Sequence, residues 1–310
     1  MGLLPHGPKR ESGLERNYEG RFSTKKPDFI ESAVLLRTLT NYDRNGFVQF
    51  LLGLFPFDRE DVWQAVKDYL IGTTKDGKTI FWQIDQAGRI RTGKIIDYDR
   101  ATGKRRKDVN PNWTHSELKK AGRLKSDFEL QQCFFGEHLL SKNPGLPVAI
   151  VEAEKSAVIG SICKGVFPDL VWLACGGKAI LNAGRLARLG RDRKIILFPD
   201  ADGFEKWQGI ELDARKAGLT VNVSDLIERL ATDAERATGY DLADYLIREQ
   251  TRRNSPANRE AFRELIEERL AIMTSGGGLS EEQAEAEIET SSFYEYAIRS
   301  ALIGIIKRCK

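Results

Sequence analysis

The middle of the chain alternates between short, wholly apolar runs and longer segments with the spacing of helices. Strands that are apolar on both faces and separated by helices are typical of a parallel sheet covered on both sides. The pattern therefore predicts an α/β unit over 144–250, which begins at the break Pro144-Gly145. The predicted strands are 147–152, 170–175, 194–199 and 219–223, and the predicted helices are 154–164, 178–189 and 203–217.

Residues 32–143 show a different pattern, in which helical periods come before alternating strands. Apolar positions predict two helices between residues 41 and 72 and another from about 128 to 140. Two strand-like runs between 79 and 98 meet across the turn Gln86-Ala87-Gly88. We therefore predict an α+β domain with an antiparallel hairpin, which precedes the parallel sheet.

The two ends of the chain lack both patterns. Residues 1–31 hold Gly, Pro and charged side chains without a period, which predicts a flexible leader. Residues 251–310 have helical periods with a break at the glycines 276–278, which predicts a helical C-terminal region.

Composition narrows the classes of protein that the chain can belong to. The 310 residues carry a formal net charge of +3 at pH 7, which by itself favours no polyanionic partner. The four cysteines stand singly and the three histidines lie at no zinc-ligand spacing from them, so we expect free thiols in a reducing cytoplasm. No apolar run approaches the ~20 residues that cross a membrane, and we expect no membrane partner.

Acidic residues follow two of the predicted parallel strands. Glu152 ends the first strand, and Asp200 and Asp202 follow the third. Because the carboxyl ends of parallel strands meet at one edge, the three side chains converge if these strands are neighbours. Two carboxylates about 4–5 Å apart repel by roughly 3–4 kcal/mol at an effective dielectric near 20, and a divalent cation relieves this repulsion. Oxygen ligands alone favour Mg²⁺ or Mn²⁺ over zinc.

A simpler interpretation of each acid stays open. Asp200 or Asp202 can cap the helix that begins near Gly203, and Glu152 can be a solvated acid in the first turn of a helix. The equivalent positions of Glu152 and the two aspartates at two strand ends favour the metal site.

The segment 146–247 resembles a Toprim domain, the catalytic module shared by bacterial primases, topoisomerases and some nucleases. Residues 148–153, VAIVEA, resemble its apolar strand followed by Glu-Gly, and residues 195–202, IILFPDAD, resemble its apolar strand followed by Asp-x-Asp. The resemblance implies a Toprim-like parallel sheet flanked by helices, Glu152 as general acid/base, and Asp200 with Asp202 as ligands of Mg²⁺ or Mn²⁺. This sequence departs from the pattern at Ala153, where the family has glycine, and at Pro199.

Two further segments resemble primase-type relatives. Residues 240–246, YDLADYL, resemble the Asp-rich segment of that type. Asp241 and Asp244 would share a helix face and are additional acidic candidates, although a helix cap explains Asp241 equally well. Residues 32–140 more loosely resemble a domain that precedes Toprim modules in proteins of bacterial mobile elements.

The hairpin region is strongly basic. Between residues 86 and 125, twelve Lys or Arg face four Asp or Glu. Basic side chains contact phosphates, and aromatic rings such as Trp82 and Tyr98 can stack on unpaired bases. A solvated hairpin with its rings in the core is the alternative. The candidate nucleic-acid or phosphate ligands, here and in the α/β unit, are Arg89, Arg91, Lys94, Lys104, Arg105, Arg106, Lys155 and Lys178.

Together these features predict a cytoplasmic Toprim protein of the primase type, encoded by a mobile element, that synthesises primers by metal-dependent nucleotidyl transfer. Single-stranded DNA and NTPs are the expected partners, and a helicase or another replication protein is a further candidate. A Toprim nuclease and a non-catalytic module that binds single-stranded DNA are the alternatives.

Overall fold

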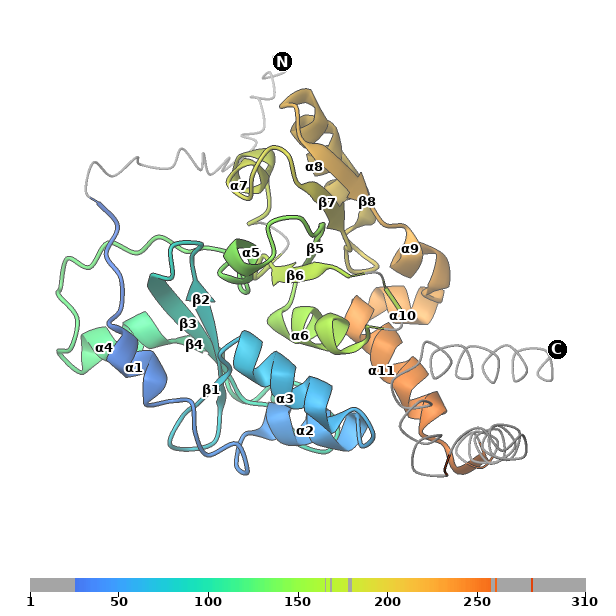
Figure 1. Ribbon diagram of the computed structural model, residues 1–310, viewed down its shortest axis with the longest axis horizontal. Coiled ribbons are helices and arrows are strands. Elements are labelled where there is room, and N and C mark those ends of the chain that lie inside the picture. The colour runs from blue at the N-terminus through green and yellow to red at the C-terminus, as the bar shows by residue number, and fades with distance from the viewer. Residues whose placement is uncertain are drawn as a thin grey trace, which may run out of the picture.

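The computed structural model describes residues 26–257 apart from 165, 168, 178 and 179, together with 260 and 280. It contains an antiparallel sheet of order β1-β2-β3-β4 and a parallel sheet of order β6-β5-β7-β8 (Figure 1). The predicted fold class is confirmed: a parallel sheet flanked by helices follows a unit with an antiparallel hairpin.

The antiparallel sheet is built on the predicted hairpin. Strands β2 (Thr79–Ile84) and β3 (Ile90–Ile96) pair across a turn in which Gly88 has a φ of 77°. The short strands β1 (Gly72–Thr73) and β4 (Asn112–Trp113) form the two edges. The helices of this unit are α1 (Ser32–Leu36), α2 (Gly46–Leu54), α3 (Arg59–Asp68) and α4 (Thr114–Lys120).

All four predicted parallel strands are present. Every residue of the central strand β5 (Val148–Val151) and of β6 (Val171–Ala174) is buried, which explains why these strands are apolar on both faces. Strand β7 (Lys194–Leu197) pairs with β5 on the side away from β6, and β8 (Thr220–Val223) forms the other edge.

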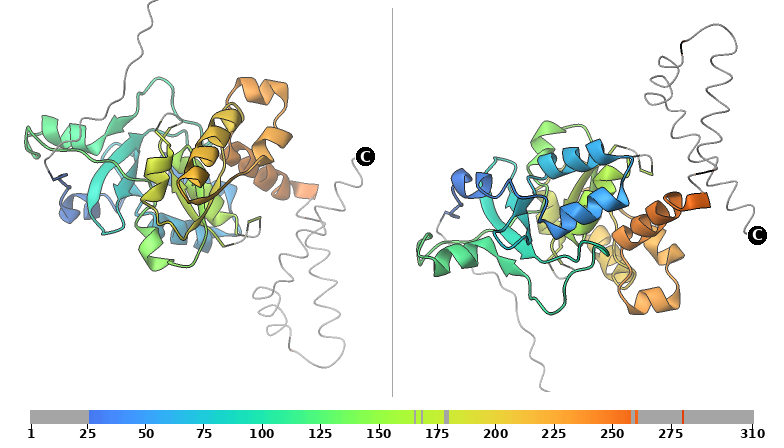
Figure 2. Two further views of the ribbon diagram at one scale, coloured as in Figure 1. Left: turned by 90° about the horizontal axis from the view of Figure 1, so that it is seen from above. Right: turned by 90° about the horizontal axis from the view of Figure 1, so that it is seen from below.

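Helices cover both faces of the parallel sheet (Figures 1 and 2). Helix α6 (Glu154–Ile162), which follows β5, packs against α3 and α11 (Leu242–Arg253). Helix α8 (Phe204–Lys216), which follows β7, packs against α7 (Ala183–Ala187). In the sheet, β6 lies beside β5 on one side, and β8 lies beside β7 on the other side. The direction in which successive strands are added therefore reverses between β5 and β7. The short helices α9 (Leu226–Leu230) and α10 (Asp233–Ala237) lead into α11.

One hydrophobic core joins the two sheets. It runs from Phe47 on α2 to Leu246 on α11 without a break at the predicted boundary near residue 144. The hydroxyl of Tyr69 donates to the carbonyl of Trp172 at 2.9 Å, so α3 is also tied to β6 by a buried hydrogen bond. The two predicted domains therefore pack as parts of one folded unit.

The predicted helix over 128–140 is wrong. Phe135 instead forms an antiparallel bridge with Ala174 at the edge of the parallel sheet, and only α5 (Leu139–Lys142) is helical. Gly136 has a φ of 81°, and a Cβ at this position would lie 2.8 Å from the carbonyl oxygen of Trp172. The apolar side chains of this segment are buried as an extended chain, which periodicity alone does not distinguish from a short helix.

The ends of the described chain modify two other predictions. Ile30, in the predicted leader, is 2% exposed, and its N–H donates to the carbonyl of Ile90 at 2.7 Å. The rest of the leader, up to residue 25, and most of the predicted C-terminal helical region lie outside the described residues. No helix in the described part of the chain combines the length and apolar character that a membrane span requires.

Candidate active site

The two acidic motifs leave the sheet side by side. Strands β5 and β7 are parallel neighbours, with Ile150 opposite Leu197, and the N–H of Phe198 donates to the carbonyl of Ile150 at 2.8 Å. Glu152 and Asp200 therefore follow adjacent strands at the point where the strand order reverses. Ligands of open α/β sheets bind at such a switch point, beyond the carboxyl ends of the strands.

The carboxylate of Glu152 lies against the loop that carries both aspartates. A Cβ placed on Gly203 would be 3.1 Å from Oε1 of Glu152 and 3.3 Å from the carbonyl oxygen of Asp200. Glu152 is 6% exposed, whereas Asp200 is half-buried and Asp202 is exposed. The glycine that begins α8 thus leaves the space that brings the buried glutamate next to the aspartate loop.

Both departures from the Toprim pattern fit the local backbone. Ala153 is the N-cap of α6 with φ −101° and ψ 145°, an extended conformation that any residue adopts. Pro199 lies just beyond the ladder bond of Phe198, where its missing N–H removes no bond between the strands. Neither residue distorts the strand end that it follows.

A buried ion pair beside the site joins the two sheets. Nζ of Lys94 on β3 lies 2.9 Å from Oε2 and 3.2 Å from Oε1 of Glu154, in the first turn of α6. The two side chains are 17% and 2% exposed. We expected Lys94 to bind phosphate, and the structure instead gives it a buried carboxylate partner. Sequence reasoning missed Glu154 as its partner, because no local pattern links a strand of one sheet with a helix 60 residues later.

Tyr98, just after β3, is buried, and charged groups shift its pKa. Burial raises the pKa of Tyr98 well above its usual value, the carboxylates of Glu154 and Asp241 raise it further, and Arg105 lowers it. Tyr98 and Arg105 face each other in an antiparallel bridge, and the ion pair of Lys94 and Glu154 places the strand before this loop beside the start of α6.

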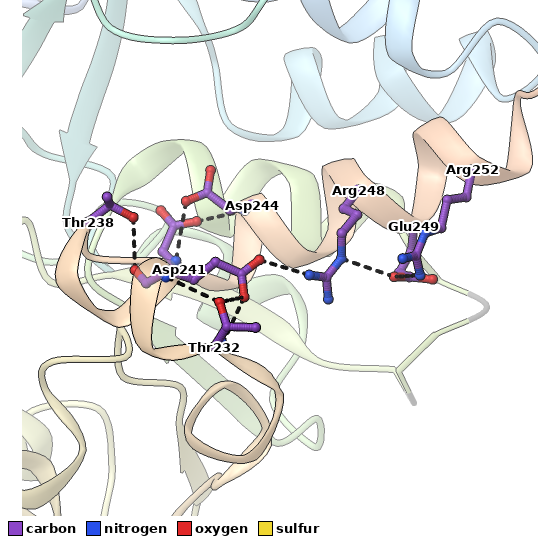
Figure 3. Close-up of polar contacts among 8 residues, drawn as sticks. Thr232, Thr238, Asp241, Asp244, Arg248, Glu249 and Arg252 are labelled. Carbon is purple, nitrogen blue, oxygen red and sulfur yellow. Dashed lines mark hydrogen bonds and ion pairs between the residues drawn. The ribbon is translucent and has the colours of Figure 1, made fainter.

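Asp241 and Asp244 form a capping box at the start of α11 (Figure 3). Oδ1 of Asp241 accepts a hydrogen bond from the N–H of Asp244 at 2.8 Å, and its Oδ2 accepts one from the hydroxyl of Ser156 at 3.1 Å. Nζ of Lys155 lies 3.6 Å from Oδ1 of Asp244. Burial raises the pKa of Asp241, while Lys155 lowers it. The alternative interpretation of Asp241 as a helix cap is confirmed.

The capped helix adjoins the aspartate loop. The N–H of Ala201 donates to the carbonyl of Tyr240 at 2.9 Å, which ties the loop after β7 to the residue before Asp241. Acidic residues from three separate segments therefore border the carboxyl end of the parallel sheet.

The donor chemistry of this edge suits a hard cation. Within the described residues, no three His, Cys, Asp or Glu side chains are grouped closely enough to hold a metal ion together. Mg²⁺ typically takes one or two protein carboxylates and completes its octahedron with water and substrate phosphates, so it does not need three. Asp200 and Asp202, next to Glu152, fit this requirement, and the role of the three acids at a metal site stays a prediction.

The basic candidates divide into buried and exposed side chains. Arg91 is 5% exposed, lies 2.8 Å from Oδ2 of Asp85, and donates to the carbonyl of Asp28, so it serves the interior rather than a surface. Arg89 pairs with the same aspartate and is half exposed. The exposed candidates with the strongest local charge are Lys104, Arg105 and Arg106, which follow Gly103 in the loop after β3. Lys178 lies outside the described residues.

The aromatic rings of the hairpin belong to the core. Phe81 and Trp82 are fully buried, and Tyr98 is 8% exposed, so the alternative to base stacking is confirmed for these three rings. Trp113 on β4 is half-buried.

The fold and its acidic edge define an α/β protein with a site at the topological switch point. A family model described as "Domain of unknown function (DUF6371)" matches residues 45–201, and the chain belongs to this family. The match begins at the N-cap of α2 and ends in the aspartate loop, so it includes both sheets up to β7. No curated protein matches the chain in sequence.

Several solved structures are similar to the chain. The primase fragment of the bacteriophage T7 primase-helicase protein has 20% identity and a TM-score of 0.38, over 61% of this chain and 66% of that fragment. The zinc-binding and RNA polymerase domains of Aquifex aeolicus primase have 15% identity and a TM-score of 0.35, over 81% of this chain and 58% of theirs. The RNA polymerase domain of Mycobacterium tuberculosis primase has 16% identity and a TM-score of 0.32, over 78% and 77%. The chain thus spans about two thirds of the T7 fragment and less of the Aquifex chain.

Proposed function

We propose that the chain is a Toprim protein of the primase type, which synthesises primers on DNA by nucleotidyl transfer with Mg²⁺ or Mn²⁺. One observation carries this proposal: Glu152 from β5 lies against the loop of Asp200 and Asp202 from β7, at the switch point of the sheet. These are the residue types and strand ends that the resemblance to Toprim domains requires. The looser resemblance of residues 32–140 supports replication of a mobile element as the setting.

Each acidic residue has a separate task in this proposal. Asp200 and Asp202 hold the ion, and Glu152 accepts the proton of the attacking 3′ hydroxyl as the new phosphodiester bond forms and pyrophosphate leaves. A bound Mg²⁺ supplies positive charge that polarises the phosphate and orients the reacting oxygens. Burial of Glu152 keeps water from competing for its carboxylate, which favours a fixed position next to the loop.

The exposed basic loop supplies the contacts to nucleic acid. Lys104, Arg105 and Arg106 are exposed, and Arg105 pairs with Tyr98 in an antiparallel bridge just after β3, the strand whose Lys94 is paired with Glu154. A single strand whose phosphates contact this loop would therefore pass the acidic edge. This arrangement supports single-stranded DNA as the template and NTPs as the substrates.

A primer-synthesis assay tests the proposal. The chain is incubated with single-stranded DNA, NTPs and Mg²⁺, and the variants Asp200→Asn and Asp202→Asn are compared with Asp213→Asn, an exposed aspartate on α8. We expect primers from the unchanged chain and from Asp213→Asn, and a loss of about 100-fold or more in the two loop variants. The proposal fails if the unchanged chain makes no primers, or if the loop variants make as many as it does.

The same assay without NTPs separates the two alternatives. A Toprim nuclease would use the same carboxylates to cleave nucleic acid, and it needs only the metal ion. A non-catalytic binding module would retain single-stranded DNA affinity in Asp200→Asn and Asp202→Asn, and it would show no turnover under either condition.

A further inference from the structure

A second candidate site lies between the turn of β2 and β3, the extended segment 131–137, and α7. It is a cavity of about 260 Å³. Its charged lining consists of four guanidinium groups and two carboxylates, so positive charge prevails. These residues are Asp85, Arg89, Arg91, Glu137, Arg185 and Arg188.

Asp85 holds the hairpin side of the cavity in place. Its Oδ1 accepts the N–H groups of Ala87 and Arg89, each at 3.0 Å, and its Oδ2 accepts Nε of Arg89 and of Arg91, each at 2.9 Å. Both oxygens of the Asp85 carboxylate therefore accept hydrogen bonds from the hairpin. The bond to Arg89 uses Nε, and within the described residues no hydrogen bond uses its two Nη groups.

Arg185 is fixed on the opposite wall. Its guanidinium carbon lies 4.8 Å from the ring centre of Phe134, and its Nη1 donates to the carbonyl of Ile180 at 3.4 Å. Burial lowers the pKa of Arg185, while Glu137 raises it. A guanidinium that is stacked in this way keeps edge donors for a planar or tetrahedral anion.

The remaining charged residues complete the cavity. Arg188 is exposed at the rim, and its carbonyl accepts Nε2 of Gln86 at 3.0 Å, which tethers the end of α7 to the hairpin turn. Oε2 of Glu137 accepts the N–H of Phe134 at 3.0 Å, so this acid is bonded to the cavity wall. Arginines from a hairpin and from a helix therefore converge on one space, while the two acids are bonded to the protein.

We propose that this cavity binds the phosphate or diphosphate group of a phosphorylated ligand. Arginine matches phosphate oxygens through paired hydrogen bonds. Of the four guanidinium groups here, Arg89 bonds to Asp85 through Nε and Arg91 is held by Asp85 and Asp28, whereas Arg185 and Arg188 make no bond to Asp85. The volume is below the roughly 300–1,000 Å³ of pockets that enclose whole small molecules, which favours the anionic end of a larger ligand. A free nucleotide and the phosphorylated end of a nucleic acid both carry this group. The inference does not depend on metal chemistry at the acidic edge.

Isothermal titration calorimetry in EDTA tests this site. The probes are inorganic pyrophosphate, ATP, and an oligothymidylate with or without a 5′ phosphate. We expect pyrophosphate to bind the unchanged chain, and Arg188→Gln and Arg89→Gln each to weaken binding about tenfold, because each removes a charge-assisted hydrogen bond. The matched control is Arg229→Gln, an arginine on α9 that is exposed to 67% and should bind as the unchanged chain does. Circular dichroism checks that each variant is folded.

The other probes identify the ligand that carries the phosphate, and the variant Asp200→Asn separates this cavity from the candidate active site. Competition by ATP alone indicates a free nucleotide, and competition by the 5′-phosphorylated oligonucleotide but not by its unphosphorylated form indicates a nucleic-acid end. Asp200→Asn should bind pyrophosphate as tightly as the unchanged chain, whatever the outcome of the primer assay. The proposal is overturned if the unchanged chain does not bind pyrophosphate, or if Arg188→Gln and Arg89→Gln both bind it as tightly as Arg229→Gln does.

Discussion

At the scale of single residues, Gly203 controls how closely Glu152 approaches the aspartate loop. Its φ of −113° is open to any residue, so the backbone does not require glycine there. The space is tight, however, because an added Cβ would meet Oε1 of Glu152 at 3.1 Å and the carbonyl oxygen of Asp200 at 3.3 Å. A methyl group at this position therefore tests the geometry of the site without removing a charge.

We predict that Gly203→Ala lowers primer synthesis by about tenfold or more, because displacement of a catalytic carboxylate disrupts its alignment with the substrate. The thermal midpoint should change little, since one side chain can shift by a few tenths of an ångström. Gly209→Ala on the same helix is the control, because its Cβ would meet nothing within 4 Å. Equal activity of the two variants would contradict the placement of Glu152.

Asp85 provides a second test at this scale, through pH. Burial raises the pKa of Asp85, but the hydrogen bonds from Arg89 and Arg91 outweigh it and hold the pKa below the usual 3.8. A carboxylate with a lowered folded pKa stabilises the fold above its unfolded pKa, and this contribution is lost as pH falls through the folded value.

We therefore predict that Asp85→Asn lowers the free energy of unfolding by about 3 kcal/mol at pH 7, because it leaves the buried Arg91 without its carboxylate. Urea denaturation at pH 7, 5 and 3 measures the difference between the variant and the unchanged chain. The difference should be the same at pH 7 and 5 and smaller at pH 3. A difference that grows toward acid pH would show that the sign of the shift is wrong.

At the scale of elements, the sequence predicts those strands and turns that have a local pattern of apolar and polar residues. The parallel strands were predicted because strands buried on both faces are apolar throughout, and the hairpin because two alternating runs flank a glycine turn. The segment 128–140 was predicted wrongly, because its apolar residues are buried through an edge contact of Phe135 with Ala174 that lies outside the local pattern. The neighbouring positions of β5 and β7 could be expected from the motifs at their ends.

The ion pair of Lys94 and Glu154 shows why the rest of the site was not predictable. Lys94 lies on β3 of the antiparallel sheet and Glu154 in α6 beside the parallel sheet, and only the packing of the two units brings them together. The same holds for the cavity of arginines beside α7. Contacts between distant elements depend on tertiary packing, which a single sequence does not display.

We predict that Lys94→Met and Glu154→Leu, made singly, each lower the free energy of unfolding by about 3–5 kcal/mol, because each leaves a buried charge without a partner. The double variant should lose less than either single variant, since no unpaired charge remains. Urea unfolding of the four proteins gives the coupling energy. The exposed pair Lys120 and Glu117 is the control, and its loss should leave the free energy of unfolding nearly unchanged, because solvent screens exposed ion pairs. Single and double variants whose losses simply add would contradict the pairing.

At the scale of the whole molecule, two sheets with one core bring a basic loop next to an acidic edge. The loop of Lys104, Arg105 and Arg106 comes from the antiparallel unit, and the carboxylates come from the parallel sheet. Neither unit alone would contain both surfaces, so the proposed function belongs to the joined fold.

We predict that changing Lys104, Arg105 and Arg106 together to Gln weakens binding of single-stranded DNA. The slope of log affinity against log salt should decrease in magnitude by about 2, at about 0.7 for each lost phosphate contact. Fluorescence anisotropy at several salt concentrations measures the slope. The matched control changes the exposed cations Lys206, Lys216 and Arg229 to Gln, and a similar loss in both triple variants would show that only net charge matters.

We expect Asp200 and Asp202 to bind one divalent ion beside Glu152, at the switch point of the parallel sheet. Titration of Mn²⁺ followed by electron paramagnetic resonance counts this ion directly, without any requirement for turnover. The account predicts about one site for each chain, which is lost in Asp200→Asn and in Asp202→Asn and retained in Asp213→Asn. Equal Mn²⁺ binding by the unchanged chain and both loop variants would contradict it.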